Sequence, residues 1–186
     1  MRHLVFILLT LIGIFCFADA PKTLTVKSGQ INFVATGHPS ALKVVGHGNK
    51  VKGSLHLQST IVEGNVSFDL GSLDTGVELR NHHMKEKYLE VAKYPEARLT
   101  LKKMNLPVAP LTPGFKVADL PFSGDLMLHG ITKPVHGTVS IVNNSGELVC
   151  DAQFQIKISD YSIAVPKYLG ITIADDVQVN THTSLQ

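Results

Sequence analysis

The sequence predicts an antiparallel β-barrel of about eight strands that contains one substantial helix. Apolar and polar residues alternate in most segments after residue 20, turn residues separate these segments at short spacing, and one helical pattern interrupts them. A single helix cannot cover the apolar faces of so many strands, so the strands must cover one another. A closed barrel and a two-layer sandwich both achieve this, and the absence of Trp from the chain favours the barrel.

The first twenty residues form a segment of their own. A basic start precedes an apolar run over residues 4–17, and the small-residue pattern Ala-Asp-Ala ends at Ala20. This pattern is typical of a secretory signal peptide. No later segment has the roughly 20 consecutive apolar residues of a transmembrane helix. We therefore expect cleavage near Ala20, a single domain over residues 21–186, and a periplasmic or secreted location.

The strands follow from the alternation of apolar and polar residues. In the longest example, Cys150, Ala152 and Phe154 begin one face of a strand, and Asp151 and Gln153 begin the other. A strand of this kind buries its apolar face and leaves its polar face to solvent. The pattern predicts strands at residues 31–36, 54–58, 65–70, 97–102, 125–129, 135–141, 150–159 and 177–185.

The predicted helix spans residues 76–93. Its start resembles a capping box, because Thr75 precedes Glu78 by three positions. A helix from this start places Met84 and Tyr88 on one face. It must end near residue 94, because Pro95 disfavours helical geometry in the residue before it.

Several functions are disfavoured by what the sequence contains. The formal net charge is +2, and the basic residues form no stripe, so we expect no nucleic-acid partner. His82, His83 and Glu86 lie close together on the predicted helix, but they match no metal-binding motif, and we expect neither a metal nor another cofactor. The sequence has no Gly-x-Ser-x-Gly motif and no paired carboxylates in an apolar run, so we expect no enzyme. A hydrolase acting on a hydrophobic substrate is the alternative.

Three stretches resemble the YceI-like family of polyisoprenoid-binding proteins. The first runs from Asp-Thr-Gly at residues 74–76 through Leu-Arg-Asn-His-His-Met-Lys at residues 79–85 to Tyr-Pro at residues 94–95. The second contains Leu-His-Gly-Ile-Thr-Lys-Pro at residues 128–134, and the third contains Ile-Lys-Ile-Ser-Asp-Tyr at residues 156–161. The order and spacing of these stretches cover nearly the whole chain after residue 20.

The resemblance implies a lipocalin-like barrel that binds, transports or stores a long apolar lipid, a polyisoprenoid such as a quinone or its precursor. It implies that this lipid lies in an internal tunnel, and that the helix and the loop over residues 162–174 close or gate one end. Family members often pair as dimers, which leaves a homodimer open. Many members carry aromatic residues where this chain has Gly48 and Val51, so we expect a larger or differently shaped cavity there.

In this interpretation the inward-facing residues are both core and tunnel wall, and the tyrosines suit a tunnel mouth because each ring joins an apolar body to a hydroxyl group. Arg80 either binds a head group or fixes the start of the helix through a structural hydrogen bond. A barrel whose core is filled by its own side chains is the alternative, and the volume of the cavity separates the two. The predicted ligand-binding residues are Phe33, Phe68, Leu70, Arg80, His83, Met84, Tyr88, Tyr94, Leu99, Leu101, Phe122, Leu126, Leu128, Val139, Ile141, Phe154, Ile156, Ile158 and Tyr161.

Overall fold

The structure, a computed structural model, describes residues 20–38, 43–168 and 171–186. The expected signal peptide falls on residues 1–20, and all of it except Ala20 lies outside the described residues. Within the described part of the chain, no helix is both long and apolar enough to cross a membrane.

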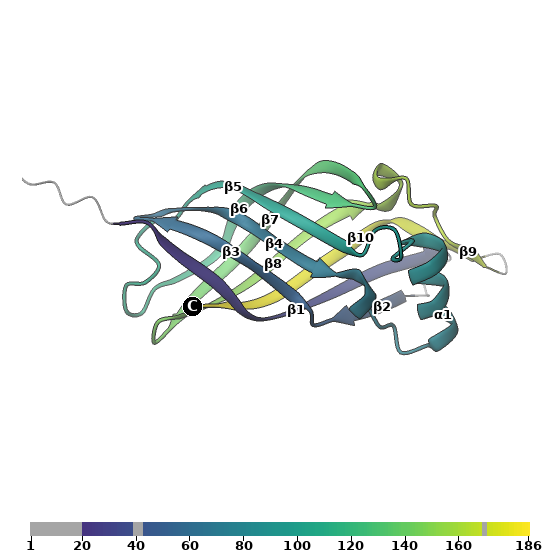
Figure 1. Cartoon of the computed structure of the whole chain (residues 1–186), viewed down its shortest axis with the longest axis horizontal. Coiled ribbons are helices and arrows are strands. Elements are labelled where there is room, and N and C mark those ends of the chain that lie inside the picture. The colour runs from purple at the N-terminus through teal and green to yellow at the C-terminus, as the bar shows by residue number, and fades with distance from the viewer. Residues whose placement is uncertain (1–19, 39–42, 169–170) are drawn as a thin grey trace, which may run out of the picture.

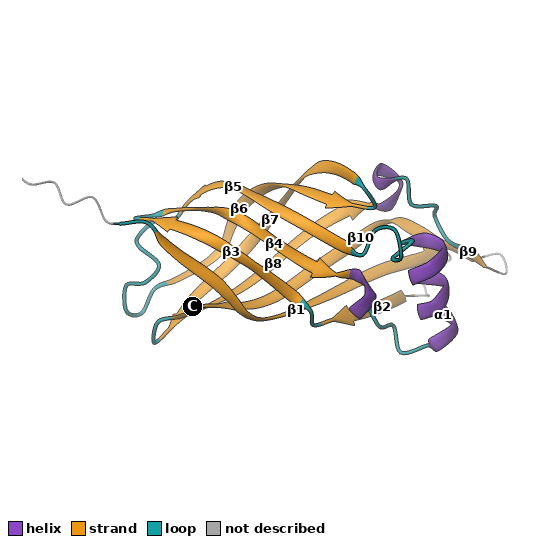
Figure 2. Cartoon of the chain, in the orientation of Figure 1, coloured by secondary structure: helices purple, strands orange, loops and turns teal. Residues whose placement is uncertain are grey.

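Eight antiparallel strands form a closed barrel, which confirms the predicted fold class (Figure 1, Figure 2). The ring closes because the first strand pairs with the last, so that neither keeps a free edge along this contact. In ring order the strands are β1 (Lys22–His38), β3 (Val51–Gln58), β4 (Ile61–Asp69), β5 (Glu96–Asn105), β6 (Lys116–Leu128), β7 (Ile131–Asn144), β8 (Glu147–Lys157) and β10 (Ile171–Leu185).

Strand β1 is longer than predicted and contacts three neighbours. One edge pairs with β10, and the other edge pairs with β3 over Lys22–Thr25 and with β2 (Lys43–Gly48) over Ile31–Thr36. The alternation pattern missed the first nine residues of β1 because polar and small residues interrupt it around Gly29. A side chain at Gly29 would place its Cβ only 2.6 Å from Cβ of Val51, so the close packing of β1 on β3 requires glycine. The short strand β9 (Lys167–Tyr168) pairs with β10.

The helical segment is present but shorter than predicted. An α-helix, α1 (Glu78–His82), continues directly into a turn of π-helix at His83–Tyr88. The expected capping box is wrong: Val77 is the N-cap, and the backbone N and Oγ1 of Thr75 instead donate to Oδ1 of Asn81, at 2.8 and 2.7 Å. The helix ends before Pro95 because Glu90 adopts a left-handed conformation with φ of 44°.

The two ends of the barrel are covered differently. The helix lies across one end, as the right-hand side of Figure 1 shows. At the other end, the loop over residues 106–115 folds inward, with Leu106, Pro110 and Phe115 buried. We call this loop the plug. The buried side chain of Asn143 holds the plug, because its Nδ2 donates to the carbonyl oxygens of Pro110 and Thr112 at 3.0 and 3.3 Å.

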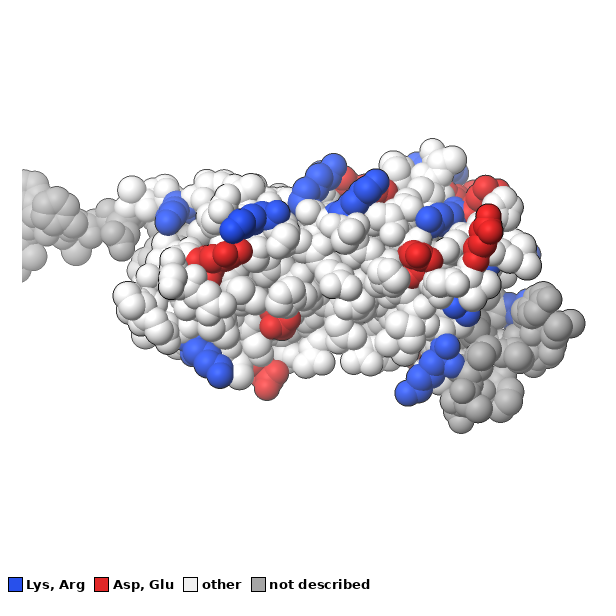
Figure 3. Space-filling view, turned by 90° about the horizontal axis from the view of Figure 1, so that it is seen from below, with Lys and Arg blue, Asp and Glu red and all other residues white. Residues whose placement is uncertain are grey.

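The outer wall carries the polar residues of each strand. Basic and acidic side chains are interspersed on the face that Figure 3 displays. Some of them pair between strands: Lys52 on β3 reaches Glu96 on β5 at 3.1 Å, and Lys102 on β5 contacts Asp125 on β6 at 3.0 Å. Exposed pairs of this kind contribute little to stability, so the fold depends on the inner face of the wall.

Candidate binding cavity

Two chambers occupy the interior of the barrel. The large chamber has a volume of about 560 Å³ and lies beneath the helix, between β1, β6, β8 and β10. The small chamber has a volume of about 160 Å³ and lies toward the plug, with Leu106 and Pro110 in its wall. The large chamber alone falls within the range of roughly 300–1,000 Å³ that is typical of ligand sites. The alternative of a completely filled core therefore does not describe this barrel.

The chambers meet at a waist inside the barrel. Four residues line both of them, and they come from four strands: Ile31 on β1, Phe68 on β4, Ala97 on β5 and Leu126 on β6. Because both chambers touch the same side chains, they are contiguous along the barrel. A flexible chain that entered the large chamber would reach the small one by passing this waist.

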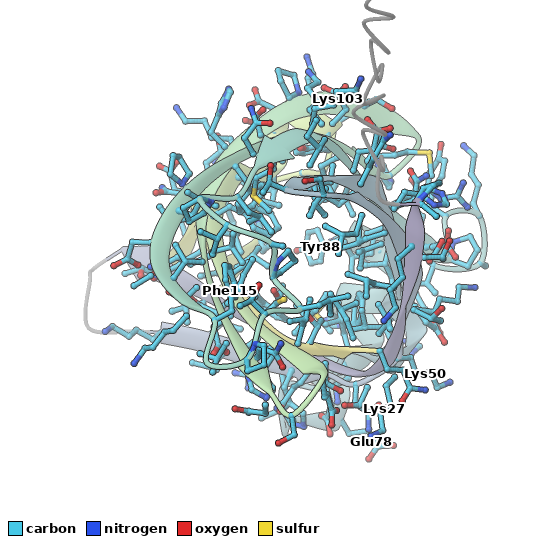
Figure 4. The ribbon with its side chains drawn as sticks, turned by 90° about the vertical axis from the view of Figure 1, so that its left-hand side faces the viewer. Lys27, Lys50, Glu78, Tyr88, Lys103 and Phe115 are labelled. Atoms are coloured by element: carbon cyan, nitrogen blue, oxygen red, sulfur yellow. The ribbon has the colours of Figure 1, made fainter. Side chains whose placement is uncertain are left out.

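The inward-facing residues do not fill the interior. Leu99 and Leu101 on β5 point inward, as do Ala152 and Phe154 on β8, yet all four are only partly buried. In a packed core such side chains would be almost fully covered by their neighbours. They remain partly accessible because branched aliphatic residues on opposite walls do not reach one another. Figure 4 looks along the barrel and shows Tyr88 projecting into this space.

The large chamber has exposed residues in its wall, whereas the small chamber has none among the described residues. Five residues that line the large chamber are exposed: Val77, Leu79, His83, Lys87 and Lys167. We call them the entrance rim. Val77 and Leu79 are unusual in this position, because 47% and 61% of their surfaces are accessible. None of the described residues that line the small chamber is exposed, so the cavity has its entrance at the helix end.

The two chambers also differ in polarity. The wall of the small chamber contains no charged residue among those described, and its hydroxyl groups are those of Ser67, Thr181 and Thr183. The wall of the large chamber is apolar on the barrel side. Its polar groups come mainly from the helix and the segment before it, where Thr75, Arg80, His83, Lys87 and Tyr88 contribute.

All but two of the residues predicted from the sequence lie in the chamber walls. Phe68 and Leu126 are at the waist. The small chamber contains Leu99, Leu101, Phe122, Val139, Ile141 and Phe154. The large chamber contains Phe33, Leu70, Arg80, His83, Met84, Tyr88, Leu128, Ile156 and Ile158.

Tyr94 and Tyr161 line neither chamber, contrary to the expectation that they form the mouth. The ring of Tyr94 packs against His129 with 4.4 Å between the ring centroids. Tyr161 is almost fully buried, and burial raises the pKa of its hydroxyl group to about 12. His129 joins these elements, since its Nδ1 lies 3.0 Å from the carbonyl oxygen of Tyr161 and its Nε2 lies 2.7 Å from Glu90. These residues support the barrel wall rather than the cavity.

The structure confirms the structural role of Arg80 and places its side chain in the chamber wall. Its Nε donates to Oγ1 of Thr75 at 2.8 Å, and its Nη2 donates to the carbonyl oxygen of the same residue. Asn81 holds Thr75 from the other side, and its Nδ2 donates to Asp74 at 2.7 Å. Arg80 anchors the start of the helix and also forms part of the chamber wall.

Sequence reasoning missed two cationic residues of the rim, Lys87 and Lys167. Lys87 lies seven positions after Arg80 and four after His83, so the helical period could have placed all three on one face. Lys167 is in β9, which the alternation pattern did not reveal, and nothing in the sequence near it indicates a cavity.

The other reactive groups near the cavity are constrained by their surroundings. Cys150 faces the small chamber, and burial raises the pKa of its thiol to about 12, which keeps it protonated and unreactive. On the outer side of the helix, Nδ1 of His82 lies 3.0 Å from Glu86. Among the described residues, no three metal-ligating side chains converge.

The expected enlargement of the cavity at Gly48 is not present, because Phe68 occupies that space. A Cβ at Gly48 would lie 2.5 Å from Cζ of Phe68, so the ring packs directly on the glycine backbone. The ring of Phe68 on β4 thus takes the space that an aromatic side chain at Gly48 on β2 would need.

Because the Phe68 ring and a side chain at residue 48 would need the same space, substitutions at these two positions should have coupled effects on stability. Gly48→Phe alone should reduce the free energy of unfolding by about 1–3 kcal/mol through overpacking, and Phe68→Ala alone by about 3–5 kcal/mol. The double variant should lose at least about 1 kcal/mol less unfolding free energy than the two single variants together, because the new ring fills the space that the Phe68 ring leaves. Urea unfolding of all four proteins measures this coupling, and strictly additive effects would show that the rings do not compete for one space.

Comparison with known proteins places the chain in context. A family model described as the YceI-like domain matches residues 23–185. UPF0312 proteins of Pseudomonas savastanoi pv. phaseolicola and Pseudomonas syringae pv. tomato are 42% identical over 72 residues, a segment that covers 38% of this chain and 33% of each relative. The match therefore spans about a third of the length of these curated relatives.

Three solved structures share the fold. A polyisoprenoid-binding domain from Saccharophagus degradans has a TM-score of 0.68 at 19% identity, covering 88% of this chain and 97% of that one. BcnA from Burkholderia cenocepacia has a TM-score of 0.65 at 18% identity, covering 84% and 95%. A YceI protein from Campylobacter jejuni has a TM-score of 0.55 at 19% identity, covering 76% and 83%. At these identities the likeness shows a common architecture.

Proposed function

Because the chain belongs to the YceI-like family, we propose that it binds a long apolar lipid, a polyisoprenoid, lengthwise in its two chambers. The observation that carries this proposal is the pair of adjoining apolar chambers inside the barrel, of which the larger lies beneath the helix. A related structure from Saccharophagus degradans is named as a polyisoprenoid-binding domain, which supports the same ligand class. The signal-peptide pattern supports a carrier or store that works in the periplasm or outside the cell.

The energetics of such binding are adequate. Each CH₂ group that leaves water for an apolar wall contributes about 0.8 kcal/mol, so ten such groups supply roughly 8 kcal/mol before the cost of association. The apolar wall can provide this binding free energy to any lipid chain of suitable width. Polar recognition is needed only where the head group meets water, at the entrance rim.

We propose a binding protein rather than an enzyme. The chamber walls contain one histidine, His83, and no carboxylate among the described residues. Ser67 is on the wall of the small chamber, whereas His83 is on the entrance rim of the large one, so the two do not form a nucleophile and base pair. Nothing in the wall supports hydrolysis of a bound lipid.

The proposal is tested by identifying what the protein carries. The full chain is expressed with its N-terminal segment, recovered from outside the cytoplasm, and examined by native mass spectrometry and by organic extraction. A prenyl lipid bound at one molecule per protein is expected. A protein that is empty as purified and also fails to take up geranylgeraniol or a longer polyprenol would contradict the proposal.

A further inference from the structure

The entrance of the large chamber is cationic. Arg80, Lys87 and Lys167 line this chamber together with His83, and no Asp or Glu is among the described residues of its wall. A neutral head group could accept hydrogen bonds here, but only an anionic head group would also gain from the concentrated positive charge. The charges therefore contribute to recognition of the ligand's head group, in addition to the apolar contacts that bind its tail.

Three of the nearby carboxylates are engaged elsewhere. Glu86 pairs with His82 at 3.0 Å and Glu90 with His129 at 2.7 Å. Asp74 accepts hydrogen bonds from the backbone N of Gly76 and from Asn81, and these bonds hold the pKa of its carboxyl group below the usual value. Within the described residues, none of these acids forms an ion pair with a cationic residue of the chamber.

Arg80 is prepared to receive an anion. Two of its N–H donors bind Thr75, which is buried, so the guanidinium is held in place before any ligand arrives. Three of its five donors remain for another acceptor. A planar guanidinium with free donors recognises phosphate and carboxylate groups especially well.

Lys87 adds a second cation on the same face of the helix. Its Nζ lies 5.5 Å from the ring centroid of Tyr88, whose side chain projects into the lumen (Figure 4). Lys167 faces the same chamber from β9, a segment remote in sequence. Positive charge therefore reaches the chamber from two separate elements.

The cavity also imposes a direction on its ligand. The described residues of the small chamber include none that is charged or exposed, while those of the large chamber include the exposed and cationic residues. An amphiphile can satisfy both ends only with its tail toward the plug and its head at the rim. We infer that the protein selects lipids with an anionic head, phosphate or carboxylate, over neutral lipids with the same chain. This inference rests on the proposed function and names its ligand class.

The test compares ligands that differ only in the head group. Affinities are measured for geranylgeranyl phosphate against geranylgeraniol, and for hexadecanoate against hexadecanol. The anion of each pair should bind at least about tenfold more tightly, which is the effect of one charge-assisted contact. Preference in the prenyl pair alone would identify a phosphate, and preference in the acyl pair alone a carboxylate. Added salt should weaken binding of the anions and leave the alcohols unchanged.

Two matched variants test whether the cations of the entrance rim, rather than positive charge elsewhere on the protein, cause the preference for anions. Lys87→Gln combined with Lys167→Gln should weaken anion binding by about tenfold or more and change alcohol binding by less than about twofold. Lys103→Gln combined with Lys116→Gln removes the same charge from exposed residues that line neither chamber and should change neither. Arg80 is left intact because it also fixes the start of the helix.

The outcomes distinguish the preference for an anionic head group from lipid binding itself. Equal affinity for anion and alcohol in both pairs, or an equal loss in the control variant, would overturn the inference while the lipid-binding proposal stands. Failure of all four ligands to bind would instead contradict lipid binding itself.

Discussion

Replacing Ala97 with Phe should lower the affinity for a long polyprenol by at least about tenfold, because the loss of two or more buried CH₂ groups has that effect. Ala97 is one of four residues that line both chambers, and it is the smallest of them. It is paired with Phe68 on the neighbouring strand, so a second ring there would close the waist. The tail of a long lipid would then be confined to the large chamber.

The measurement compares a long and a short ligand on the same variant. Solanesol should lose affinity in Ala97→Phe, whereas farnesol should keep it because the large chamber remains open. Ala118→Phe adds an identical ring at an exposed position on β6 and should affect neither ligand. If solanesol bound Ala97→Phe as well as it binds the unaltered protein, the ligand would not pass the waist.

Asn143→Leu should reduce the free energy of unfolding by about 3–4 kcal/mol, a large effect for one substitution. The Asn143 side chain makes the two hydrogen bonds to the plug, and its Oδ1 also accepts from the backbone N of Gly146 at 2.7 Å. Leucine has a similar size but leaves these three backbone groups without their partner. A buried backbone group without a partner is costly, and the plug would keep only the backbone hydrogen bond from N of residue 143 to the carbonyl oxygen of Phe115 at this point of β7.

Chemical denaturation measures this loss, and hydrogen exchange locates it. Faster exchange is expected in residues 106–115, with little change around the helix. The neighbouring Asn144 is exposed, so Asn144→Leu should shift stability by no more than about 0.5 kcal/mol. Equal effects of the two substitutions would mean that the hydrogen bonds to the plug are not what stabilises this end.

Alternation was sufficient to predict the strands, because period two is a direct consequence of strand geometry. The choice of a barrel over a sandwich needed the absence of Trp and the resemblance to the YceI-like family. The sequence was also sufficient to predict most of the cavity wall, since inward-facing residues such as Leu99 and Ile156 must line whatever lies inside. Alternation cannot show whether opposite walls touch. The presence and the volume of the chambers therefore required the coordinates.

Other features depend on contacts that no local pattern encodes. Tyr94 and Tyr161 are outside the cavity because His129 draws them together across the wall, and these three residues are distant in sequence. The expected capping box at Thr75 does not form, because the backbone N and the hydroxyl group of Thr75 donate to Asn81 instead. The ring of Phe68 reaches Gly48 only after β2 and β3 align along β1.

The pairing of β1 with β10 has a consequence for how the barrel folds. These strands come from opposite ends of the chain, and the backbone N of Thr25 donates to Gln186, the final residue, at 2.8 Å. Contacts between such distant segments form slowly, because the intervening chain must lose its freedom first. Until β10 pairs with both β1 and β8, the interior of the barrel stays open to water. A chain in which β10 has not yet paired therefore exposes its apolar lining, so closure of the ring is the step that protects the protein from aggregation.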